Sequence, residues 1–211
     1  MADQLPAPGT PGNPLTLTDP TMMRALAHPA RIAIWQYLGF EGPATATECA
    51  RVTDLSPSAC SYHLRALARY GFVEEDRASA ADARQRPWRA KVIAFTISDD
   101  PGVPRETQLA GQLLAESLRA MADEIRERYL DRQSDYPAEW RAALGGMQDL
   151  LHVTPDELSA LKRRLVELFD EYRRLDRAER PAGTRRIKLV LDVYPWFGPE
   201  EAGDGAVGED P

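Results

Sequence analysis

The residues from Ser56 to Arg69 carry the side chains best suited to chemistry in this chain, and that chemistry is recognition of a polar surface. A helix that enters the major groove of DNA presents short hydrogen-bonding side chains near its N-terminus and a long donor further along. The sequence SPSACSYHLRALAR has this order, with Ser61 and Tyr62 ahead of Arg65. The pattern favours a recognition helix over its plain alternative, a solvated helix face.

The segment before this helix contains signals for the elements that would position it. The sequence TATE at 45–48 has the form of a capping box, which predicts a short helix ending near Thr53. Ser56 and Pro57 predict the N-cap and first residue of the next helix. Gly71 predicts its end. Further upstream, Asp-Pro and His-Pro pairs at 19–20 and 28–29 predict two more helix starts.

A hairpin is expected after the second of these helices. Residues 72–75 and 88–97 have strand patterns, and the polar loop 76–86 separates them. Arg84 and Arg86 lie in or beside this loop, where guanidinium groups reach phosphate or a narrow minor groove. A solvated loop in an arginine-rich chain is the alternative.

Helix, capped short helix, turn, second helix and hairpin is the order of a winged helix-turn-helix. The segments ALAHPAR, SACSYHLRALARYGFVEE and RPWRA resemble the DNA-binding domain of ArsR-type transcriptional regulators, in a branch with a longer C-terminal region. The resemblance covers about residues 22–90 and implies a sequence-specific regulator of transcription, expected to be a repressor. The positions expected to contact double-stranded DNA are Ser58, Ala59, Ser61, Tyr62, His63, Arg65, Arg69, Arg84 and Arg86.

The C-terminal half contains two apolar stripes at helical spacing. One runs from Leu114 to Tyr129, and the other follows a seven-residue repeat from Leu158 to Leu175. Together they expose more apolar surface than a small unit buries, which predicts a homodimer through this half and an inverted-repeat DNA site. The alternating sequence RRIKLVLDVY predicts a strand, with residues 149–153 as its partner.

These patterns predict an α+β fold that is mainly α, with a small two-stranded sheet in the C-terminal region. The expected organisation is a disordered arm (1–18), a winged helix-turn-helix (19–98), a linker (99–104), a dimerisation and possible effector domain (105–197) and a flexible acidic tail (198–211). Six C-terminal aromatic residues could line a pocket for an unidentified small-molecule effector, although core residues are the plainer interpretation: Tyr136, Trp140, Tyr172, Tyr194, Trp196 and Phe197.

Composition and missing motifs exclude several function classes. The net charge is −7, yet residues 21–97 hold 10 basic and 7 acidic residues, so the expected DNA-binding segment is mildly basic. The closely spaced cysteine pair of ArsR-type metal sensors is missing, because residues 45–53 hold only Cys49. Cys60 and His63 are too few to close a metal site. We therefore expect no metal.

The sequence contains no phosphate-binding glycine loop, HExxH helix or G-x-S-x-G elbow, so we expect no catalysis and no cofactor. No apolar run is long enough to span a bilayer, and the N-terminus lacks a signal-peptide pattern, so a cytoplasmic location is expected. The alternative to a DNA-binding regulator is a winged-helix module that binds another protein without DNA readout. A polar, basic face on the helix 57–69 favours the regulator.

Overall fold

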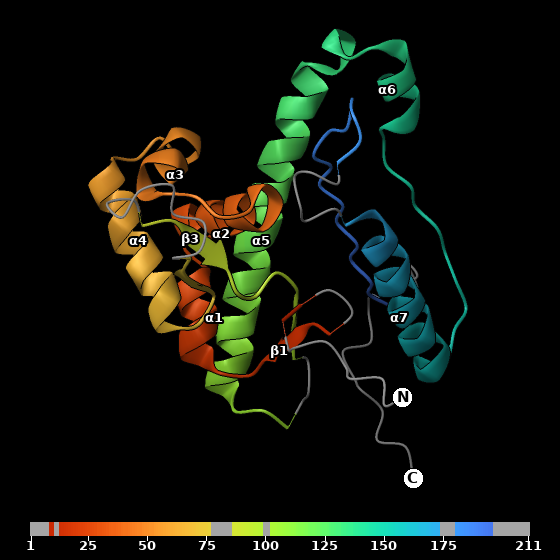
Figure 1. Cartoon of the computed structure of the whole chain (residues 1–211). Coiled ribbons are helices and arrows are strands. Elements are labelled where there is room, and N and C mark those ends of the chain that lie inside the picture. Colours follow the sequence, from red (N-terminus) through yellow and green to blue (C-terminus); the bar gives the residue numbers. More distant parts are fainter. Residues whose placement is uncertain (1–8, 11–12, 77–85, 99–101, 174–179, 196–211) are drawn as a thin grey trace, which may run out of the picture.

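The computed structural model of the chain describes residues 9–10, 13–76, 86–98, 102–173 and 180–195 (Figure 1). Within these ranges it contains seven α-helices, a 3-10 helix and four short strands, so the expected mainly helical α+β class is confirmed. The four N-terminal helices are α1 (Pro20–Leu26), α2 (Pro29–Glu41), α3 (Ala46–Thr53) and α4 (Pro57–Arg69).

Each of these helices begins at the cap that the sequence predicts. The side chains of Asp19 and His28 accept hydrogen bonds from amides in the first turns of α1 and α2, and a proline follows each cap. Thr45 forms a complete capping box at the start of α3, and Ser56 caps α4. Local side-chain chemistry therefore fixes where all four helices start.

The hairpin after α4 is present, and its return strand is shorter than expected. Strand β2 (Val73–Glu75) pairs antiparallel with β3 (Trp88–Ala90). The expected strand 88–97 is in fact two strands, because the chain leaves the hairpin after β3 and then forms β4 (Phe95–Ile97) in a second sheet. Residues 77–85 of the polar loop lie outside the described residues.

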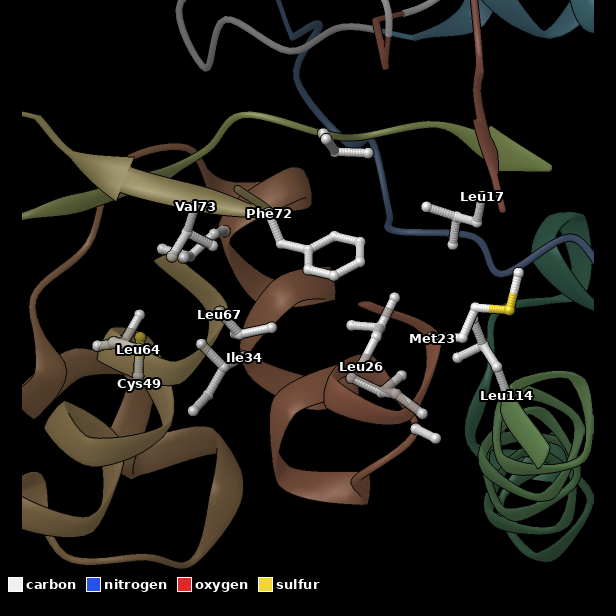
Figure 2. Close-up of a cluster of buried hydrophobic side chains, with 14 of the residues drawn as sticks. Leu17, Met23, Leu26, Ile34, Cys49, Leu64, Leu67, Phe72, Val73 and Leu114 are labelled. Carbon is white, nitrogen blue, oxygen red and sulfur yellow. The ribbon is translucent and has the colours of Figure 1, made fainter. Parts of the chain in front are cut away.

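The prediction of a disordered arm over residues 1–18 is wrong for its last part. Residues Leu15–Leu17 form strand β1, which pairs parallel with β4. Leu17 is only 1% exposed, and Figure 2 shows its side chain beside Met23 of α1. The alternating Leu-Thr-Leu sequence gives this strand one apolar side chain to bury, which holds the segment against the core.

The core joins the helix-turn-helix to the long helix α5 (Arg105–Asp131). Met23 and Leu26 of α1 lie against Leu114 of α5, at the edge of a cluster that continues through Phe72 (Figure 2). Close approach of α5 to the second sheet depends on Gly111, because a Cβ there would lie 2.9 Å from Cγ2 of Ile97. The first half of α5 is therefore part of the N-terminal core. The expectation that the stripe from Leu114 to Tyr129 is exposed is wrong at its start, because Leu114 is buried in the chain's own core and Leu118 and Met121 pack against it.

The rest of the C-terminal half, as far as the structure describes it, is exposed or only partly buried in the single chain. It comprises the end of α5, a 3-10 helix (Gln133–Asp135), α6 (Ala138–Ala143) and α7 (Pro155–Tyr172), which begins at the predicted capping box of Thr154. No residue of α6 or α7 is fully buried.

The predicted C-terminal sheet does not form among the described residues. Segments 149–153 and 185–195 contain no strand, and both are exposed. Side chains hold the second segment instead: Asp192 pairs with Arg119 of α5, and Arg186 pairs with Glu41 at the end of α2. Alternation predicts an extended backbone but does not identify its partner, which is why the pairing prediction is wrong.

Candidate nucleic-acid interface

Helices α3 and α4 form a helix-turn-helix whose geometry is fixed by caps on both sides of the turn. The Glu48 amide donates to Thr45 Oγ1 at 3.3 Å, and the Thr45 amide donates to Glu48 Oε2 at 2.7 Å. The Thr45 hydroxyl also donates to Glu48 Oε2, at 2.7 Å, and the two donors of Thr45 that reach this carboxylate lower the pKa of Glu48 below its ordinary value. Asp54 adopts the left-handed conformation (φ 52°) in the turn, and the Ala59 amide donates to Ser56 Oγ at 3.2 Å to start α4.

The inner face of α4 is locked to α3 and to the core. Cys60, Leu64 and Leu67 are buried on this face, together with Cys49 of α3. The Thr53 hydroxyl lies 3.3 Å from Cys60 Sγ, which adds a polar contact between the two helices. Because one face of α4 is fully engaged, the opposite face must point to solvent.

The outer face of α4 presents a polar stripe, which consists of Ser58, Tyr62, Arg65 and Arg69. All four are exposed, Tyr62 by 60%, and their spacing of four, three and four residues places them on one side of the helix. The stripe extends over roughly 16 Å, given a rise of about 1.5 Å per residue. The structure thus brings together four of the residues that the sequence singled out.

Ala59 and Ser61 lie at the edges of this stripe and are partly buried. The Ser61 hydroxyl donates to the carbonyl of Pro57 at 2.9 Å, so part of its hydrogen-bonding capacity is used within the helix. Ser58 Oγ lies 2.9 Å from Ser56 Oγ at the helix start. Both serines are therefore oriented by the first turn of α4.

His63 differs from the other predicted contact residues because it is buried, with 9% exposure. Its ring lies 4.8 Å from the ring of His28 and 5.4 Å from that of Tyr62 (centroid distances). Burial, with the nearby His28 and Arg31, lowers the pKa of His63 below its usual value. His63 is three residues after Cys60 and four before Leu67, so helical spacing places it on the buried face of α4. This spacing is the sequence signal that predicts its inward position.

The β2–β3 hairpin and Arg86 form the wing, which is held by α2 and by the segment that follows α2. Main-chain atoms of Ala44 and Trp88 exchange two hydrogen bonds of 2.9 and 2.8 Å, and the Trp35 indole donates to the carbonyl of Val92. Arg86 is exposed, whereas Glu74 pairs with Arg89 and lies 4.0 Å from Lys91. Arg84 lies outside the described residues.

Three arginines of the helix-turn-helix form no close ion pair within the described part of the chain: Arg51, Arg65 and Arg69. Arg51 still lies near enough to Glu48 for its charge to help lower the pKa of that carboxyl. Arg51 is exposed in the last turn of α3 and is not among the contact residues predicted from the sequence. Basic residues are common near the C-terminal ends of helices, so the residue type alone does not mark Arg51 as a contact residue. Its position beside the turn that leads to α4 is the feature that distinguishes it.

Other potential sites are less developed. The two cysteines are free and buried, and burial raises the pKa of the Cys49 thiol to about 12, which suppresses its thiolate. In the C-terminal half, the Arg185 guanidinium lies 5.2 Å from the ring centre of Tyr136 and 5.4 Å from that of Trp140. Tyr172 and Tyr194 are exposed, and Trp196 and Phe197 fall outside the described residues.

A polar cavity of about 450 Å³ lies between the turn of the helix-turn-helix and the last turns of α5. Asp54, Arg128, Asp131 and Arg132 line it. Its two acidic and two basic side chains balance in charge, and Arg128 also pairs with Glu124. The lining therefore favours neither an anionic nor a cationic ligand.

Comparison with known proteins agrees with this geometry. Residues 26–76 match the family model of a helix-turn-helix domain. The matched stretch ends just after β2, and such domains are typical of DNA-binding regulators of transcription. None of the curated proteins compared matches the chain. Among the described residues, every helix is too short or too polar to cross a membrane.

Proposed function

We propose that this protein is a sequence-specific regulator of transcription of the ArsR type, which represses by binding an inverted repeat as a homodimer. The polar stripe of α4 is the observation that carries the proposal. It is exposed along its whole length, while the opposite face of the same helix is buried. A helix of about 10–12 Å diameter fits the major groove, so this stripe is suited to meet base edges.

Residues along the stripe would have different roles. Ser58 and Tyr62, near the capped start of α4, are suited to base edges, with Ala59 and Ser61 allowing close approach of the backbone. Arg65 is long enough to reach a base or a flanking phosphate. Buried His63 supports the Tyr62 ring from behind, at 5.4 Å between ring centres.

Phosphate contacts would surround this base-reading helix. Arg51 at the end of α3 and Arg69 at the end of α4 are exposed and have no ion-pair partner among the described residues. Arg86 of the wing would reach the backbone or the minor groove, and the same role is proposed from the sequence for Arg84, which lies outside the described residues. Arg89 and Lys91 fit this role less well because Glu74 offsets their charge.

A homodimer would cover the apolar side chains that the single chain leaves exposed. They occur on α5 at Leu109 and Leu113, and on α7 at Leu168 and Tyr172. Contiguous exposed apolar surface marks an interaction site in soluble proteins. A two-fold pair of helix-turn-helix units would then place its two α4 helices about one turn of DNA apart, roughly 34 Å.

The test is a salt titration of DNA binding. The operator is selected from random duplexes with the intact protein, and its affinity is compared with that of a random duplex for Tyr62→Ala, Arg65→Ala, Arg84→Ala and Arg86→Ala. Removing a phosphate contact lowers the log–log salt slope by about 0.9 per contact. Loss of a bidentate base contact costs about 1–3 kcal/mol of discrimination at one base pair.

The wing variants are expected to weaken binding to both duplexes alike, and the α4 variants to reduce the operator-to-random ratio. Arg163→Ala on exposed α7 is the matched control and should change neither quantity. Transcription from a promoter carrying the operator should fall when the protein is present. If the wing variants bind normally and Arg65→Ala keeps the operator-to-random ratio, the protein is instead a winged-helix module that binds another protein.

A further inference from the structure

The segment from Arg186 to Tyr194 has the properties of a β-strand without a sheet. It runs without a turn, bend or helical residue, and every side chain in it is exposed. None of its backbone amides or carbonyls forms a hydrogen bond with another described backbone group. Its odd positions 187, 189, 191 and 193 are all aliphatic, and Val190 adds an apolar side chain to the other face.

Such a segment is a template for pairing with another strand. An unpaired row of amide and carbonyl groups beside apolar side chains is what proteins normally cover or blunt with charges, bulges or proline. Here Pro195 closes the segment, but residues 186–194 contain no proline that would interrupt a ladder. The missing element is therefore a partner strand.

We propose that the partner is the same segment of a second copy, paired antiparallel about a two-fold axis through Val190. This inference rests on the proposed homodimer and names the strands that would hold it together. In this register Ile187 opposes Val193, and Leu189 opposes Leu191. On the other face Lys188 opposes Asp192, Arg186 opposes Tyr194, and the two Val190 residues meet at the axis.

Charge and apolar matching select this register over its neighbours. An axis at Lys188 would set two lysines against each other, and like charges directly opposite destabilise a sheet. An axis at Leu191 would place Asp192 against Val190, and an axis at Leu189 would place Lys188 against Val190. A parallel in-register pair would align every charge with its own copy. Only the axis at Val190 gives each aliphatic residue an aliphatic partner.

The side chains that hold the segment in the single chain can be released at small cost. Asp192 pairs with Arg119, and Arg186 with Glu41, but the arginines and Asp192 are all well exposed. Exposed ion pairs contribute about 0–1 kcal/mol each. Lys188 belongs to no ion pair among the described residues, and burial of its amine lowers its pKa, so Asp192 of the second copy would supply the opposite charge that it lacks.

Disulfide cross-linking of full-length protein tests the register directly. Directly opposed residues of an antiparallel pair have Cα atoms about 4.5–5.5 Å apart, which is within disulfide range. Val190→Cys is therefore expected to form a covalent dimer under mild oxidation. Val193→Cys is the matched control, because the two valines are 49% and 48% exposed but position 193 lies roughly 20 Å from its own copy in this register.

We expect Val190→Cys to cross-link at least about tenfold faster than Val193→Cys. The native cysteines are both buried, so the wild-type protein should stay uncross-linked. Equal rates for the two variants, faster reaction of Val193→Cys, or no reaction of Val190→Cys would each overturn the proposal. If this segment instead paired with residues 149–153 of the second copy, Val190→Cys would not cross-link.

Charge reversal supplies a second test that needs no cysteine. Lys188→Asp and Asp192→Lys should each raise the dimer dissociation constant by about tenfold, because each sets like charges opposite in two symmetric places. The double variant K188D/D192K should restore the wild-type value, and failure to restore it would contradict the register. Circular dichroism checks that each variant is folded.

The dimer, the strand register and DNA binding can fail separately in these experiments. A wild-type protein that sediments as a monomer at micromolar concentration would remove both the proposed homodimer and this inference. A dimer whose Val190→Cys variant does not cross-link would remove the inference alone. Cross-linking at Val190 in a protein without operator preference would leave the strand pairing standing and reject the DNA-binding function.

Discussion

Truncation of Leu114 to alanine should destabilise the helix-turn-helix, although this residue lies 38 positions beyond the end of the matched domain. Leu114 is fully buried between α5 and α1. The change removes three carbons, and each buried methylene is worth about 0.8 kcal/mol, so the transfer contribution is roughly 2.4 kcal/mol. The cavity left behind raises the expected loss in the free energy of unfolding to about 3–4 kcal/mol.

The measurement is urea unfolding followed by tryptophan fluorescence. In a W140F/W196F background the remaining signals come from Trp35 and Trp88, which belong to α2 and the wing. With a slope of about 2 kcal/mol per molar urea, Leu114→Ala should lower the midpoint by roughly 1.5–2 M.

Leu130→Ala is the matched control for this substitution. It makes the same change in the same helix, but at a side chain that is 44% exposed. At low protein concentration this variant should lower the urea midpoint much less than Leu114→Ala does. If the fluorescence transition of Leu114→Ala coincides with that of the wild type, α5 is not part of the core that holds the helix-turn-helix, and the reasoning is refuted.

Two further predictions concern the titratable groups of α3. The hydrogen bonds from Thr45 lower the pKa of Glu48. Their contribution to stability is therefore complete above the ordinary pKa of 4.5 and is lost as the pH falls through the lowered pKa. In urea unfolding, Glu48→Gln should destabilise the protein by up to about 1 kcal/mol at pH 7 and by less at pH 3. The pKa of Cys49 is raised to about 12 and Cys60 is buried, so a thiol reagent at pH 8 should label neither cysteine until the protein is unfolded. For the same reason, equimolar zinc or arsenite should leave the affinity for DNA unchanged. Release of DNA by a stoichiometric metal ion would contradict this prediction.

Local signals in the sequence were sufficient for the helix starts and for most of the candidate interface. A cap depends on a few neighbouring residues, so Thr45, Ser56 and Thr154 could be read directly from the chain. The same holds for Gly71, whose φ of 75° is the left-handed conformation expected at the end of α4. The polar stripe followed from the helical period alone.

Features that depend on distant partners could not be predicted in the same way. Strand β1 is held by β4, which lies about 80 positions further along, and no local pattern links the two. The expected strand at 185–194 had the right alternation but no partner in its own chain. His63 lay within the predicted interface, yet the ring of His28 and the core determine its inward position.

The parallel pairing of β1 with β4, together with the burial of Leu114, has a consequence for how the protein is made. Chains are synthesised from the N-terminus, and domains generally fold as units once their residues have emerged. Met23 is synthesised early, but Leu114, which belongs to the same core cluster, emerges about ninety residues later. The nascent helix-turn-helix therefore keeps one apolar side open until the first half of α5 leaves the ribosome. For the same reason, a fragment ending at residue 98 would present that open side to chaperones and to other nascent chains.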